Sequence, residues 1–113
     1  MQSQLTDLAL RSCVGTLPAT GAVQTITTGA AADNNTTALV NGLQYDLVCT
    51  EDCYICASAT NAANDCTTSD YYLPANTIIT FTPITGLLFV SALQVATAGT
   101  VFISPRSANY KLY

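Results

Sequence analysis

The alternation of apolar and polar residues along this chain is typical of short β-strands. Residues 22–28 and 76–82 alternate one residue at a time, while residues 87–95 and 100–104 are rich in Val, Ile, Leu and Phe. In residues 87–95 both faces are mostly apolar, which indicates a strand that is covered on both sides. The last two segments are therefore predicted to form a hairpin at the centre of the core, with Gly99 supplying the positive φ of the bend.

Further short strands are separated by clear turn signals such as Asn41-Gly42. These strands are predicted at residues 36–40, 43–50, 53–58 and 71–73, and residues 109–113 could add an edge strand. Glu51 and Asp52 would form the turn of a second hairpin, and the small polar residues 59–69 are predicted to be a loop. About seven to nine short strands without a long helix predict an all-β fold, an antiparallel β-sandwich or jelly roll.

A chain of 113 residues is expected to form one domain. We assign residues 22–113 to the sandwich and residues 1–21 to an N-terminal arm or loop. The arm carries three leucines that suit either one amphipathic turn or an extended segment reaching a neighbouring subunit. The candidate interface residues are these leucines and two tyrosines: Leu5, Leu8, Leu10, Tyr71 and Tyr72. The N-terminus has no basic region followed by a long apolar run, so no signal peptide is expected.

The charge content narrows the classes of partner. Charged residues make up 9% of the chain and the net charge is −4, whereas a globular domain usually has about 25% charged residues. So few cations argue against nucleic acid and against anionic membranes as partners, and no apolar run is long enough to span a bilayer. A surface with so little charge suits either burial against other subunits or an ordinary Thr-rich sandwich.

The cysteines form the most suggestive chemical motif. Cys49-x3-Cys53-x2-Cys56 resembles the iron–sulfur ligand spacing of radical S-adenosylmethionine enzymes, and Cys66 would complete a four-cysteine zinc set. In the predicted hairpin, however, Cys53 lies on the opposite face from Cys49 and Cys56, so we expect no metal and no cofactor. Cys56 and Cys66 flank a loop and could form a disulfide.

Other catalytic or modification signals are weak. The chain has no His, which excludes Ser-His-Asp and Cys-His arrangements, and we expect a protein that is not an enzyme. Asp65 and Asp70 are conceivable calcium ligands, but Asp near turns usually bonds local backbone groups. Asn35-Thr36-Thr37 matches the N-glycosylation pattern, which is short and frequent by chance.

Three turn motifs give the chain a more specific resemblance. They read TEDC at residues 50–53, SDYYLPA at residues 69–75 and ATAGT at residues 96–100. The set resembles a family of small tailed-bacteriophage virion proteins and covers about half of the chain. Residues 1–41 and the cysteines at positions 49, 56 and 66 lie outside the pattern.

The resemblance implies a capsid decoration (cement) protein that stabilises the phage head. Its partners would be the major capsid protein and other copies of itself, as a homo-trimer, on the head surface after synthesis in the host cytoplasm. The alternative is a phage fibre, tail-associated or surface adhesin-type module that recognises glycan or protein. An exposed cluster of the tyrosines at positions 45, 54, 71 and 72 would favour that alternative.

Overall fold

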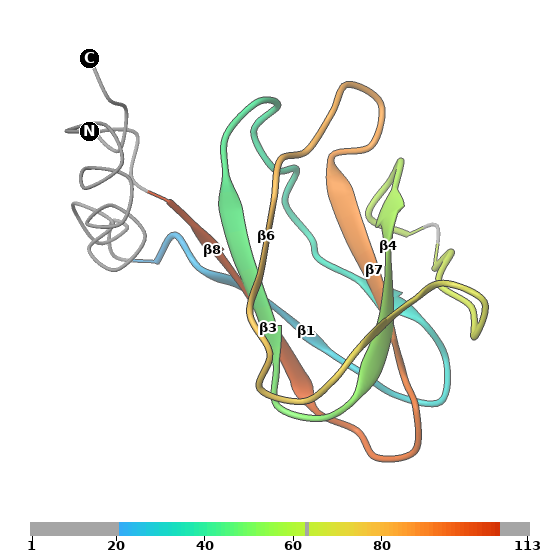
Figure 1. Cartoon of the computed structure of the whole chain (residues 1–113). Helices are drawn as coiled ribbons and strands as arrows, with labels where there is room; N and C mark the ends of the chain where they lie inside the picture. Colours follow the sequence, from blue (N-terminus) through green and yellow to red (C-terminus); the bar gives the residue numbers. More distant parts are fainter. Residues whose placement is uncertain (1–20, 63, 107–113) are drawn as a thin grey trace, which may run out of the picture.

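Two four-stranded sheets pack face to face in the computed structural model, which describes residues 21–62 and 64–106 (Figure 1). The strands are β1 (Gln24–Thr27), β2 (Asp33–Asn34), β3 (Tyr45–Cys49), β4 (Cys53–Ser58), β5 (Tyr71–Leu73), β6 (Ile79–Phe81), β7 (Phe89–Gln94) and β8 (Thr100–Pro105). The first sheet has the order β1-β8-β3-β6 and the second has the order β2-β7-β4-β5. No helix in the described residues is long and apolar enough to cross a membrane.

The strand pairing is nested from the two ends of the chain towards its middle. β1 pairs with β8, β2 with β7, β3 with β6 and β4 with β5, all antiparallel. Nested pairing of eight strands across two sheets is the arrangement of a jelly roll. The predicted all-β sandwich is therefore confirmed, with a strand number inside the predicted range.

Both predicted hairpins are wrong, because the two strands of each predicted hairpin lie in different sheets. β7 belongs to the second sheet and β8 to the first, and the same change of sheet separates β3 from β4. Cys49 consequently pairs with Val101 of β8 and not with Tyr54. The chain does turn at both predicted positions, but each turn leads from one sheet to the other rather than back along the same sheet.

Gly99 serves close packing rather than a positive φ, so that part of the prediction is also wrong. The glycines with positive φ in the described residues are Gly21, Gly42 and Gly86. A Cβ atom added at Gly99 would lie 2.8 Å from the Thr50 side-chain oxygen and 2.9 Å from the Glu51 Cβ. The two sheet-crossing connections therefore touch at Gly99, and a larger residue has no room there.

Some strand boundaries also differ from the prediction. Residues 36–40 form no strand, although the Leu39 N–H donates to the Leu88 carbonyl at 2.8 Å. The strand predicted at 76–82 is limited to β6, because Asn76 has a φ of 60° within a turn. The Asn41-Gly42 turn is confirmed by the bond of the Leu43 N–H to the Val40 carbonyl at 3.2 Å. Residues 109–113, and the predicted arm except Gly21, lie outside the described residues.

The core lies between the inner faces of the sheets. Along β3 and from Cys53 to Cys56 of β4 the buried residues alternate with half-buried ones, as the pleat requires. The buried apolar residues include Ile26, Leu47, Cys49, Cys53, Ile55, Leu73, Val90, Ala92, Val101 and Ile103. They come from both sheets, so the core is continuous across the sandwich.

The two sides of the sandwich are closed differently. Beside β1 and β2 the fully buried Asn35 joins the sheets, because its Nδ2 donates to Gln24 Oε1 and its Oδ1 accepts from the Val90 N–H, both at 2.8 Å. On the opposite side the edge strands β5 and β6 do not pair with each other. That side is where the candidate site opens.

Candidate functional site

An apolar groove opens between the edge strands β5 and β6. Its volume is about 590 Å³, and core residues of both sheets, Leu47 and Ile55, form part of its wall. Ile79 and Phe81 of β6 line it from the first sheet. We call this feature the β5–β6 groove. Because the two edge strands do not meet, the core is accessible there from outside.

A tight turn between β6 and β7 places two apolar side chains at the mouth of the groove. The Leu87 N–H donates to the Ile84 carbonyl at 2.9 Å, and Gly86 has the φ of 88° that the third position of a type II turn requires. Ile84 is 59% exposed and Leu87 is 37% exposed. Both line the groove, so its mouth presents apolar surface to solvent.

The tyrosines named from the sequence separate into three environments. Tyr71 is exposed and lines the groove. Tyr72 packs edge-on against Tyr54, with ring centroids 6.0 Å apart. Tyr45 is buried and stacks on Phe81 at 5.8 Å. The four tyrosines therefore do not form one exposed cluster.

A carboxylate lies beside the Tyr54–Tyr72 pair. The Ala75 N–H donates to Asp52 Oδ1 at 2.7 Å. This bond, followed by a hydrogen bond from Tyr72, lowers the pKa of Asp52 below its ordinary value. The same Asp52–Tyr72 bond raises the pKa of the Tyr72 hydroxyl. This arrangement stabilises the connection into β5 and fixes the orientation of the Tyr72 ring.

The cysteines of the described residues form two separate groups. Cys49 and Cys53 are buried in the core between the sheets. Burial is the largest cause and the neighbouring Cys49 is the next, and they raise the pKa of Cys53 to about 12. Side chains alternate along β4, so Cys56 lies outside this core. Ser91 of β7 is paired with Cys56, and its Oγ accepts a hydrogen bond from the Cys66 N–H at 3.1 Å. One ion therefore cannot bind all four thiols.

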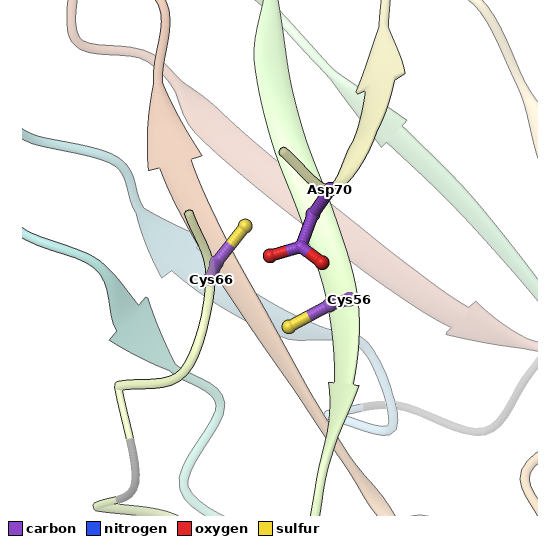
Figure 2. Close-up of side chains that lie close together, drawn as sticks. All are labelled: Cys56, Cys66 and Asp70. Atoms are coloured by element: carbon purple, nitrogen blue, oxygen red, sulfur yellow. The ribbon is translucent and has the colours of Figure 1, made fainter. Parts of the chain in front are cut away.

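On the outer face of the second sheet, two thiols meet a carboxylate. Cys56 projects from β4, Cys66 lies in the loop that follows and Asp70 comes directly before β5 (Figure 2). Their ligand atoms all lie within 4.8 Å of one another. We call these three residues the thiol–carboxylate cluster. Both cysteines are free thiols in the structure, so the disulfide between them stays a prediction.

The surroundings of the cluster hold its thiols in the protonated form at neutral pH. Burial, then the nearness of Cys56, raises the pKa of Cys66 to about 12. Burial and then the charge of Asp70 also raise the pKa of Cys56. Thr67 donates to Asp70 Oδ2 from its N–H at 2.7 Å and from its hydroxyl at 3.2 Å. The carboxylate is therefore fixed in orientation before any ligand arrives.

Sequence reasoning found part of this region and missed the rest. It named Cys56 and Cys66, which belong to the thiol–carboxylate cluster, and Tyr71, which lines the groove, and it considered Asp70 only as a calcium ligand or a turn residue. It missed the role of Ile84 at the groove mouth, although two apolar residues around a turn glycine are a visible signal. Leu5, Leu8 and Leu10 lie outside the described residues.

Comparison with known proteins adds no relative: no family model, no curated protein and no solved structure matches this chain.

Proposed function

We propose that this chain is a non-enzymatic structural protein of a bacteriophage head, a decoration protein that binds the assembled shell of major capsid protein. The observation that carries the proposal is the β5–β6 groove, with its apolar mouth on a chain so poor in charge. A protein that binds only the assembled shell stabilises that state by mass action. The residues of the groove are suited to burial, and no charged side chain of residues 21–62 and 64–106 lines it.

The exposed apolar side chains on this side of the sandwich set the energetic scale of such docking. Fully burying a large aliphatic or aromatic side chain contributes about 1.5–3 kcal/mol. Tyr71, Ile78, Ile84 and Leu87 are all exposed along this side of the sandwich. Burying them offsets the cost of ordering side chains and part of the cost of lost translational and rotational freedom, which is about 4–15 kcal/mol.

The jelly-roll fold is compatible with this function by analogy. Jelly rolls recur in viral capsid proteins and in lectins, and a fold by itself does not determine function. We propose self-association through the sandwich edges, as a homo-trimer, because decoration proteins often occupy three-fold axes. The proposed location is the phage head surface, after synthesis in the host cytoplasm.

A binding module for glycan or protein is the second candidate. The Tyr54–Tyr72 pair beside Asp52 favours it, because an aromatic platform with a fixed carboxylate can contact a sugar ring and its hydroxyls. The pair is on the outer face of the second sheet, since Tyr72 alternates with the groove-lining Tyr71. Variants at the two positions can therefore separate the two functions.

Binding to phage heads that lack the protein tests the proposal directly. Purified chain is mixed with such heads, pelleted, and the heads are then heated to measure the temperature at which they open. We expect binding that raises this temperature, and Ile84→Ser should weaken it at least about tenfold because one large apolar contact is lost. Val23→Ser, which changes an exposed residue beside β1, is the matched control.

The outcomes discriminate between the two candidates. If Ile84→Ser binds heads as tightly as the unchanged protein, the groove is not the docking surface. If the chain neither binds heads nor raises their opening temperature, and Tyr72→Ala abolishes binding in a glycan screen, the binding module is the better account. Sedimentation of the free chain as a monomer would count against the proposed trimer.

A further inference from the structure

The thiol–carboxylate cluster has the composition of a metal site. It joins two sulfurs and one carboxylate oxygen from three separate segments of the chain (Figure 2). From this geometry we propose that Cys56, Cys66 and Asp70 bind one divalent cation of the zinc class, with a fourth position open to water or to a ligand from a partner. Two sulfur ligands select a zinc-like ion over calcium or magnesium, which take oxygen ligands.

The spacing of the ligand atoms is compatible with a bound ion. Tetrahedral zinc, with Zn–S of about 2.3 Å and Zn–O of about 2.0–2.2 Å, places its ligand atoms about 3.5–3.8 Å apart. The ligand atoms all lie within 4.8 Å of one another, so no pair needs to close by more than about 1.3 Å to reach that geometry. Cys56 lies in a paired strand and the Cys66 N–H is bonded to Ser91 Oγ, so both cysteines are held in place and a small movement is enough to bind an ion.

The local charge also favours a cation. Asp65 and Asp70 lie close enough to influence the Cys56 thiol electrostatically. Among residues 21–62 and 64–106, Arg106 is the single Lys or Arg, and it pairs with Asp46 of the first sheet at 3.2 Å. If both thiols ionise, their negative charges therefore lie close to those of the carboxylates, and no other basic side chain in the described ranges is present to compensate them. A bound divalent ion removes this repulsion, and the two thiol protons pass to solvent.

Neighbouring residues already orient the ligands, as in established metal sites. Thr67 bonds Asp70 Oδ2 through both its N–H and its hydroxyl. The Cys66 backbone is held by Ser91 of β7. Such contacts around the ligands commonly contribute about 10–100-fold to metal affinity.

Metal titration of the full chain tests the proposal. The chain is purified with reductant, stripped with chelator and titrated with zinc by calorimetry, and with cobalt(II) while thiolate-to-metal absorption is recorded. We expect one ion per chain, sulfur-to-cobalt absorption and a higher melting temperature with zinc. Cys66→Ser and Asp70→Asn should each weaken zinc binding at least about tenfold.

Asp33→Asn on β2 is the matched control, because it removes one exposed charge from the same sheet and spares the three ligands. Its zinc affinity should stay within about threefold of that of the unchanged chain, since an exposed charge outside the cluster has a small effect. Far-ultraviolet circular dichroism in chelator establishes that each variant folds, and Asp70→Asn keeps the test valid if Cys66→Ser does not fold.

Three results would overturn the site. One is the absence of stoichiometric zinc or cobalt binding, and another is unchanged affinity in Cys66→Ser and Asp70→Asn. The third is a Cys56–Cys66 disulfide found by mass spectrometry in protein isolated without reductant, which would establish the disulfide instead. None of these results affects the proposed attachment to heads, which is measured separately.

Discussion

Replacing Asn35 with Ala should destabilise the fold more than any surface change. The Asn35 side chain is fully buried, and its Nδ2 donates to Gln24 Oε1 and to the Thr37 carbonyl, both at 2.8 Å. Its Oδ1 accepts from the buried Val90 N–H at 2.8 Å. Ala removes all three bonds and leaves the Val90 N–H without a side-chain partner. These bonds hold the closed side of the sandwich together.

The expected loss follows from the burial of each abandoned group. A buried N–H left unsatisfied costs about 1–3 kcal/mol, and a typical neutral hydrogen bond contributes about 0.5–1.5 kcal/mol. Gln24 and Thr37 reach solvent in part and regain some hydration, so we expect a total loss of about 2–4 kcal/mol. Asn35→Asp keeps the shape but turns a carboxylate oxygen towards two acceptors, so it should cost at least as much at neutral pH.

Urea unfolding and thermal melting measure this loss. About 2–4 kcal/mol corresponds to a fall of roughly 8–20 °C in melting temperature for a domain of this size. Asn41→Ala is the control, because Asn41 makes one exposed bond, to Thr85 Oγ1 at 2.9 Å, and should change stability by less than about 0.5 kcal/mol. Equal losses in the two variants would refute the reasoning. The same burial makes Asn35 a poor glycan acceptor in the folded protein, despite its sequence pattern.

Two further predictions concern the connections between sheets. Gly99→Ala should destabilise the fold by about 1–3 kcal/mol in urea unfolding, since its Cβ would meet Thr50 Oγ1 at 2.8 Å; Gly29→Ala, whose nearest atom lies at 3.9 Å, is the control, and equal effects would contradict the close-packing argument. The carboxyl of Asp52 should titrate by NMR below its ordinary pKa, because the Ala75 N–H stabilises its charged form. Its contribution to stability should be present above the unfolded pKa of about 3.9 and lost as pH falls through the folded value. Asp52→Asn should flatten this pH dependence, and an unchanged profile would show that the bond does not matter.

The position of most strands was predictable, but their partners were not. Alternation in residues 45–49 and 53–58 reveals a strand because it depends on neighbours in the sequence. Pairing in a jelly roll joins β1 to β8 across almost the whole described chain. A turn such as Glu51-Asp52 has the same local residues whether it returns along one sheet or crosses to the other. The two predicted hairpins failed for that reason.

The candidate site was predictable to a similar extent. The Cys56–Cys66 pairing is suggested by two thiols that flank a short polar loop. Asp70 was interpreted as a turn residue, and it does bond Thr67 locally. Its place in the thiol–carboxylate cluster depends on how the loop packs on β4, which the local sequence does not specify. The β5–β6 groove is a gap between edge strands and has no sequence signature of its own.

The loop before β5 connects the cluster to the groove. Residues 59–70 contain no large apolar residue, yet Ser58 and Ser91 are fully buried on that side of the sheet. Polar bonds hold the described part of the loop, among them Asn34 Nδ2 to the Thr60 carbonyl at 3.1 Å. Each such bond contributes only about 0.5–1.5 kcal/mol. An ion or a disulfide that joins Cys56 to Cys66 would therefore add considerably to the stability of the loop. Because Asp70 directly precedes the groove-lining Tyr71, an ion bound at the proposed site would also fix the edge strand at which the proposed attachment takes place.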